Sequence, residues 1–132
     1  MFDAAPLIDA ESMVFDLLTA AFSDAYVASE YETDLTFPAV IYSVSGDGQV
    51  GNGPGLWTLS LELSFLGPAD QAWALAARGY RAVHSWAGTT TAHGHVNAVD
   101  DESIPSRVST PEANAKTTRQ YTGVWTLTCR SV

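Results

Sequence analysis

Glycines near the middle of the chain have the spacing of a nucleotide-binding turn. Gly46, Gly48 and Gly51 satisfy the pattern GxGxxG. In nucleotide-binding proteins this turn presents a pyrophosphate to the N-terminus of the helix that follows it. Here Pro54 and Gly55 lead into a segment with the alternation of a strand. The sequence therefore lacks the context of a phosphate site, and we expect no nucleotide cofactor.

Two histidines have a spacing that suits metal binding on a strand. His93 and His95 are two residues apart, so both imidazoles would lie on one face. A structural or catalytic metal needs at least a third protein ligand. The carboxylates at 100–102 are near in sequence, but nothing in the pattern places them beside the imidazoles. We expect no metal, and we expect His84 to be a partly buried side chain at the end of a helix.

The chain offers few candidates for covalent or acid–base catalysis. Cys129 falls on the apolar face of a predicted strand, where a thiol is expected to be inert. No serine stands in a GxSxG elbow. Asp100, Asp101 and Glu102 are adjacent carboxylates, which we interpret as a solvated turn. Because no nucleophile, base and orienting group can be named together, the sequence favours a protein that is not an enzyme.

Two segments alternate strictly between apolar and polar residues and predict strands. In Leu56–Leu66 the apolar positions are Trp57, Leu59, Leu61, Leu63 and Phe65. In Arg119–Arg130 one face carries Tyr121, Gly123, Trp125, Leu127 and Cys129. A period of two places such residues on one side of a sheet. The opposite faces carry mostly Ser and Thr hydroxyls, so we expect a surface polar enough for water and nearly uncharged enough for protein contact.

Two segments have the three- and four-residue spacing of amphipathic helices. The first is predicted over Ala10–Phe22, with Asp9 as its N-cap. The second is predicted to begin at Pro68, a residue that suits the first helical position, and to run to about Trp86. Its predicted core-facing residues are Ala69, Ala72, Trp73, Ala76, Tyr80 and Val83.

Shorter strands and two long loops complete the predicted organisation. Strands are expected over Tyr26–Glu32, Ala39–Val44 and His95–Val99. Gly46–Gly55 contains five glycines and a proline, which predicts a long hairpin loop. Asp100–Thr117 has two prolines, mixed charge and no period, which predicts a second long loop.

This element order predicts an α+β fold. Two helices must each bury one stripe, and a sheet with one strongly apolar face provides the place. We therefore expect a two-layer sandwich in which a mixed or antiparallel sheet of about four or five strands packs against two helices. A chain of 132 residues fits a single domain spanning residues 1–132.

Charge and composition limit the classes of partner. Fifteen acids against six bases give a formal net charge of −9, which would repel nucleic acid rather than bind it. The hydrophobic content is 46%, but no apolar run approaches the length of a membrane span. A single cysteine allows no internal disulfide, which favours folding in a reducing cytoplasm.

The two predicted loops are the expected contact segments. Long loops inside a small domain are commonly functional. Three of the six basic residues fall in or just after the second loop, which suits docking on an acidic neighbour or on another copy of the chain. The predicted contact residues are Asp47, Gln49, Val50, Asn52, Arg107, Lys116 and Arg119.

Together these segments resemble the tail terminator (tail completion) proteins of long-tailed phages. The resemblance rests on element order over nearly the whole chain and is most distinctive at the junction after Leu66. The segments that carry it are FPAVIYSVSGD, LWTLSLELSFLG, PADQAWALAARGYRAVHSW and RQYTGVWTLTCRS.

The resemblance implies a structural virion protein made in the host cytoplasm. Such a subunit forms a hexameric ring at the head-proximal end of the tail, caps the tail tube and ends its polymerisation. Its expected partners are other copies of itself, the tail-tube protein and the head-side connector or stopper protein. DNA would pass through the lumen without specific binding, and no membrane is involved.

Two other readings remain open from the sequence. Another neck or tail-tube component would share the acidity and small size, and its assembly into open-ended tubes would distinguish it. A small host ligand-binding or enzyme domain of the α+β class is the second. That reading would be favoured by a monomer with a deep apolar cavity lined by Trp57, Tyr121 and Trp125.

Overall fold

The computed structural model describes residues 7–29, 37–49, 55–108 and 118–131. The elements along the chain are two helices and five strands. Their bounds are α1 Ala10–Ala21, β1 Tyr26–Ala28, β2 Ala39–Gln49, β3 Leu56–Pro68, α2 Ala72–His84, β4 His95–Val108 and β5 Thr118–Arg130.

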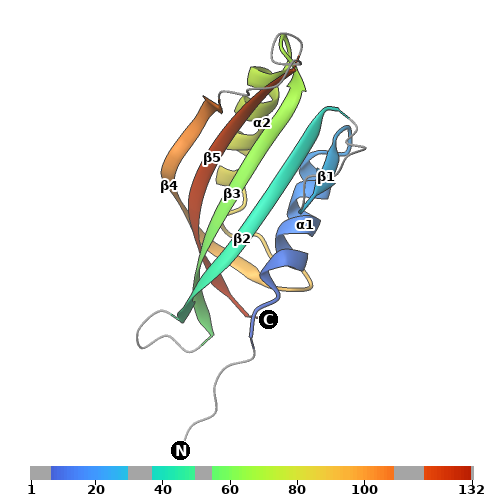
Figure 1. The fold of residues 1–132 in the computed structure, drawn as a ribbon. Coiled ribbons are helices and arrows are strands. Elements are labelled where there is room, and N and C mark those ends of the chain that lie inside the picture. Colours follow the sequence, from blue (N-terminus) through green and yellow to red (C-terminus); the bar gives the residue numbers. More distant parts are fainter. Residues whose placement is uncertain (1–6, 30–36, 50–54, 109–117, 132) are drawn as a thin grey trace, which may run out of the picture.

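The five strands form one open sheet in the order β1-β2-β3-β5-β4 (Figure 1). β1 pairs with β2 in parallel, and the three other pairs are antiparallel. The two segments with strict alternation, 56–66 and 119–130, belong to β3 and β5, which are direct neighbours in the sheet. Their alternating residues therefore line the same two faces of the sheet. The predicted class, an α+β sandwich with a mixed sheet against two helices, is confirmed.

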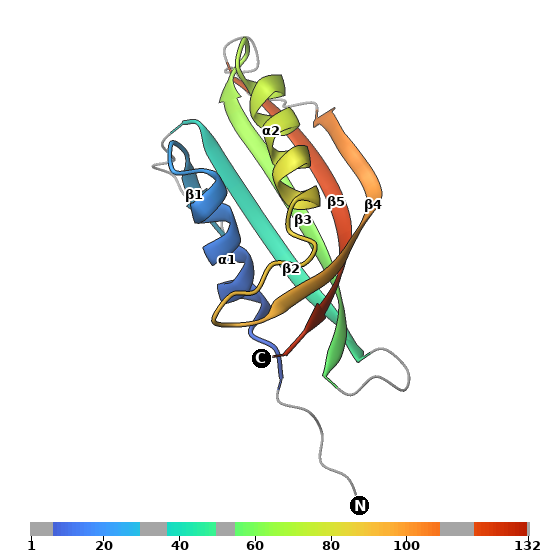
Figure 2. The same cartoon turned by 180° about the vertical axis from the view of Figure 1, so that it is seen from behind.

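Both helices lie on the same face of the sheet (Figure 2). α1 packs over β2, and α2 packs over β3 and β5. The helix-facing positions of the strands are apolar, as the period of two requires. The main core contains Leu59, Leu61, Leu63, Phe65 and Trp125, each at most 1% exposed.

Local chemistry accounts for α1. The side chain of Asp9 accepts a hydrogen bond from the amide of Ser12 at 3.2 Å, which satisfies one free donor of the first turn. The Ser12 hydroxyl first, and then this amide bond, lower the pKa of Asp9 below its usual value. Met13, Val14, Leu17 and Leu18 then lie on one buried stripe. The predicted helix is confirmed to within one residue at its C-terminal end.

Both predicted loops are wrong in their described parts. β2 continues through Gly46 to Gln49, with a register shift between Gly46 and Gly48, and Gly48 has a φ of 104°. β4 continues from Asp100 to Val108. It carries Pro105 and three acids because three register shifts relieve the regular ladder. Residues 50–54 and 109–117 lie outside the described part of the chain.

The start of the second helix was also predicted wrongly. Pro68 is the last residue of β3, where it pairs with Thr118 of β5, and α2 begins only at Ala72. Trp73, expected in the core, is 67% exposed. The buried residues of α2 are Ala72, Leu75, Ala76, Gly79 and Val83.

Candidate interaction surfaces

The face of the sheet opposite the helices is polar over much of β3 and β5, whereas Ala39, Ile41 and Leu66 form a second, buried apolar cluster at one end of it. Alternation places Ser60 of β3, Thr126 of β5 and Ser45 of β2 on this face, because each neighbours a core residue in its strand. Ser43 pairs with Glu62, and both are exposed. No helix of the described chain covers this surface, which we call the outer face (Figures 1 and 2).

Hydroxyl groups on the outer face bond to one another between strands. Ser64 Oγ lies 3.0 Å from Thr122 Oγ1, a hydrogen bond in which either hydroxyl can donate. The Gln120 side-chain amide donates to Ser64 Oγ at 3.3 Å. Thr126 donates to the carboxylate of Glu102 at the β4 edge. Ser64 itself is buried, so the bonds to it tie β3 to β5, whereas the Thr126–Glu102 bond fixes an exposed pair and reduces the conformational entropy that it would lose when a partner docks.

An apolar groove lies between α2 and β4. It has a volume of about 410 Å³. Its lining residues are Trp73, Ala76, Ala77, Tyr80, Arg81, Ile104 and Pro105. Trp73 and Ile104 are 67% and 60% exposed, so two large apolar side chains flank it in contact with water. Exposed apolar clusters of this kind mark contact sites.

A carboxylate clamp joins α2 to β4 beside this groove. Tyr80 Oη donates to Asp101 Oδ2 at 2.7 Å, and His84 Nε2 lies 2.7 Å from Asp101 Oδ1. The two rings lie 4.6 Å apart between centroids. The Tyr80 hydroxyl first, and then His84, lower the pKa of Asp101 below its usual value. The clamp therefore includes a charged carboxylate at neutral pH.

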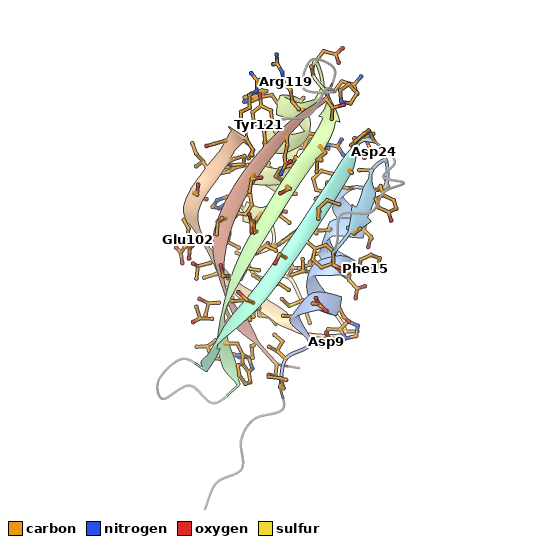
Figure 3. The ribbon with its side chains drawn as sticks, viewed as in Figure 1. Asp9, Phe15, Asp24, Glu102, Arg119 and Tyr121 are labelled. Atoms are coloured by element: carbon orange, nitrogen blue, oxygen red, sulfur yellow. The ribbon has the colours of Figure 1, made fainter. Side chains whose placement is uncertain are left out.

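β4 is a sheet edge with features that oppose pairing to another strand. Its three register shifts break the row of backbone donors and acceptors, and Pro105 removes one donor. Glu102 stands at this edge, as Figure 3 shows. Contacts at β4 are therefore expected to use side chains rather than added strand pairing.

The predicted contact residues are not all brought together. Asp47 and Gln49 belong to β2 rather than to a loop. Arg107 is an exposed residue of β4, opposite Tyr121 of β5. Arg119 is half-buried in β5, at the same end of the sheet as Tyr121 (Figure 3). Val50, Asn52 and Lys116 lie outside the described residues.

Arg107 and Arg119 do share one end of the β4–β5 pair. Arg107 pairs with Tyr121, and Arg119 is two residues before Tyr121 on β5. The Arg119 Nε is buried and has no hydrogen-bond partner among the described residues. Arg119 thus lies on a strand as predicted, whereas Arg107 was predicted in a loop and lies on β4. Their role in contacts stays a prediction.

The residues with catalytic or metal-binding chemistry are dispersed. His93 Nε2 lies 3.7 Å from Asp16 of α1, whereas His95 Nδ1 lies 2.7 Å from the Thr90 hydroxyl. Within the described ranges, no group of three or more His, Cys, Asp or Glu could hold a metal ion. Cys129 is fully buried, and burial raises its pKa to about 12. Its thiol is therefore protonated and enclosed, as the strand pattern predicted.

Sequence reasoning missed the groove because it placed Trp73 in the core. A signal was present: Ala72, Leu75, Ala76, Gly79 and Val83 form a narrower stripe at helical spacing that leaves Trp73 outside. Ile104 was assigned to a loop, and no local pattern places it opposite α2.

No helix in the described residues is long and apolar enough to cross a membrane. A comparison of the chain with models of protein families and with curated proteins found no match.

Proposed function

We propose that this chain is a phage tail terminator: a structural subunit that forms a ring, caps the tail tube, ends its polymerisation and joins the tail to the head-side connector. The observation that carries the proposal is the outer face. Within the described residues the sheet has helices on one side only, and its other side bears exposed or half-buried hydroxyls such as those of Ser45, Ser60 and Thr126. Such a face suits packing against neighbouring subunits.

The remaining surface supports assembly rather than catalysis. The groove between α2 and β4 places two exposed apolar side chains beside an edge strand. Apolar exposure of this kind is disfavoured on a solitary soluble protein and is stabilised by burial in a contact. In this proposal six copies close a ring, which also covers the free edges of the sheet.

The charge of the chain supports passage of DNA through such a ring. A formal net charge of −9 repels phosphate, so DNA would not adhere to the lumen. The tail-tube protein and the connector or stopper would be bound by the two rims of the ring. No cofactor takes part.

Light scattering coupled to size exclusion, followed by negative-stain imaging of the purified chain, tests the proposal. We expect closed rings of about six subunits, and we expect purified tail tubes to stop growing when the rings are added. Open-ended tubes of the chain alone would identify a tube subunit instead. A monomer at every concentration that leaves tube growth unchanged would overturn the proposal.

The alternative hypothesis, a small host ligand-binding domain, has less support than the ring subunit. Trp125 is fully buried, and Trp57 is half-buried with its Nε1 donating to the Ser131 hydroxyl at 2.8 Å. The groove is instead lined by α2 and β4, with Trp73 and Ile104 open to solvent.

A further inference from the structure

We infer that the groove between α2 and β4 binds residues 1–7 of a neighbouring copy of this chain. This inference rests on the proposed ring, and it specifies which surfaces join one copy to the next. The groove has exposed apolar walls, and Leu7 at the start of the described chain is 82% exposed.

The composition of residues 1–7 matches the groove. The segment reads MFDAAPL, with Met1, Phe2 and Leu7 as large apolar side chains and Asp3 as its single charged side chain. The groove presents one cation, Arg81, among apolar residues. Arg81 is exposed and forms no ion pair within the described part of the chain. Asp3 within the apolar segment can therefore pair with Arg81 within the apolar groove, so the two surfaces are complementary in charge.

The arrangement of the helices favours a neighbour over the same molecule. α1 lies over β2, whereas the groove lies beside β4, and β3 and β5 separate those two strands. α1 also begins at the end of the sheet opposite to the end where α2 begins (Figure 2). Leu7 stands three residues before the start of α1, at the end of the sheet away from Trp73 in the first turn of α2.

The contact is heterologous, because one copy contributes the segment and the other contributes the groove. Contacts of this type join subunits head to tail and generate a ring when the rotation closes. Tyr80 forms part of one wall of the groove. Its hydroxyl is held by a 2.7 Å hydrogen bond to Asp101 Oδ2. The groove is therefore formed before the neighbour binds, which reduces the entropy lost on binding.

Complementation between two variants of the full chain tests the inference. The segment variant carries Phe2→Ser and Leu7→Ser, and the groove variant carries Trp73→Ser and Ile104→Ser. Leu7, Trp73 and Ile104 are all exposed. The circular dichroism spectrum and thermal unfolding of both variants should therefore match those of the parent chain. Sedimentation should show self-association of each variant weakened at least about tenfold, since burial of two large apolar side chains is lost.

Mixing the two variants provides the sharper readout. Each retains one intact half of the contact, so the mixture should form dimers that cannot extend. A matched control is Phe15→Ser, which changes an apolar side chain of α1 that is 42% exposed. This control should associate as the parent does. A segment variant that associates normally, or a mixture that stays monomeric, would overturn the inference.

A peptide experiment separates this inference from the proposed function. The peptide MFDAAPL should shift the Trp73 emission to shorter wavelength, and Trp73→Phe should abolish that shift. If the chain stays monomeric but binds the peptide, the groove contact stands and the ring is lost. If the parent forms rings and the segment variant forms them equally well, the ring stands and this contact is wrong. Absence of peptide binding to the segment variant, whose groove is intact and has no competing segment, counts against the groove as its site.

Discussion

Gly79 of α2 lies directly against the ring of Phe65 in β3. A Cβ placed at position 79 would stand 2.2 Å from the Cε1 and Cζ atoms of that ring. The helix backbone therefore approaches the sheet more closely than a side chain would allow. Because Trp73 is six residues earlier, it lies about 120° around the helix from this contact and points away from β3. The Gly79 contact thus orients the groove wall.

Replacing Gly79 with alanine should destabilise the protein. Helix propensity favours alanine by up to about 1 kcal/mol, but overpacking a close contact costs about 1–3 kcal/mol. We expect a net loss of about 1 kcal/mol in the free energy of unfolding, measured by urea denaturation. Phe65→Leu in the same chain should remove part of that loss, because the ring is the obstructing group. A more stable Gly79→Ala variant would contradict the packing described.

Replacing Asp101 with asparagine should make stability less sensitive to acid. The carboxylate pKa is lowered by the Tyr80 hydroxyl and by His84. A lowered pKa contributes stability that is present above the unfolded pKa and is lost as pH falls through the folded pKa. The parent should therefore exceed Asp101→Asn in stability near pH 7, and the difference should close below about pH 3. Urea unfolding of both proteins near pH 7 and below about pH 3 measures this difference in stability. A difference that is the same at the two pH values would show that the charge of Asp101 is not its cause.

The Cys129 thiol should be unreactive in the folded protein. Burial raises its pKa to about 12, so almost no thiolate exists at neutral pH. Ellman's reagent at about pH 8 should release colour slowly from the native chain, and one equivalent at once after denaturation. The denatured sample is the internal control. Rapid reaction of the native chain would show that β5 opens.

A charge on the outer face should impair assembly without unfolding the subunit. Ser45 is exposed on β2, and Ser45→Arg would place a long cation on the face proposed to meet neighbours. We expect subunit association to weaken at least about tenfold while the unfolding temperature changes little. Ala87→Arg, at an exposed position after α2, adds the same charge elsewhere and should leave association unchanged. Equal association of both variants would remove the outer face from the mechanism.

Strong local patterns allowed much of the fold to be predicted. The alternation in β3 and β5 was continuous over the whole segment, so strand type, paired faces and the buried Cys129 followed directly. The predicted bounds of α1 were accurate because Asp9 and a clear apolar stripe define its start and its face. Arg119 lies on a strand as predicted, whereas Arg107 was predicted in a loop and lies on β4.

Other features depended on partners far along the chain. Asp100–Val108 is polar and contains Pro105, which reads locally as a loop, yet pairing with β5 makes it a strand. Pro68 suits a helix start, yet it is held in β3 by its position opposite Thr118. In both cases a long neighbouring strand with free hydrogen-bonding groups outweighed local propensity.

The sequence by itself determined the two-layer class, the apolar and hydroxyl faces of the sheet and the acidic character of the surface, because these follow from periodicity and composition along the chain. The tertiary structure alone decided how α2 is turned on the sheet and which residues β4 places opposite it. Those depend on a close contact between Gly79 and Phe65 and on register shifts along β5, which are relationships across distances in sequence that no local pattern encodes.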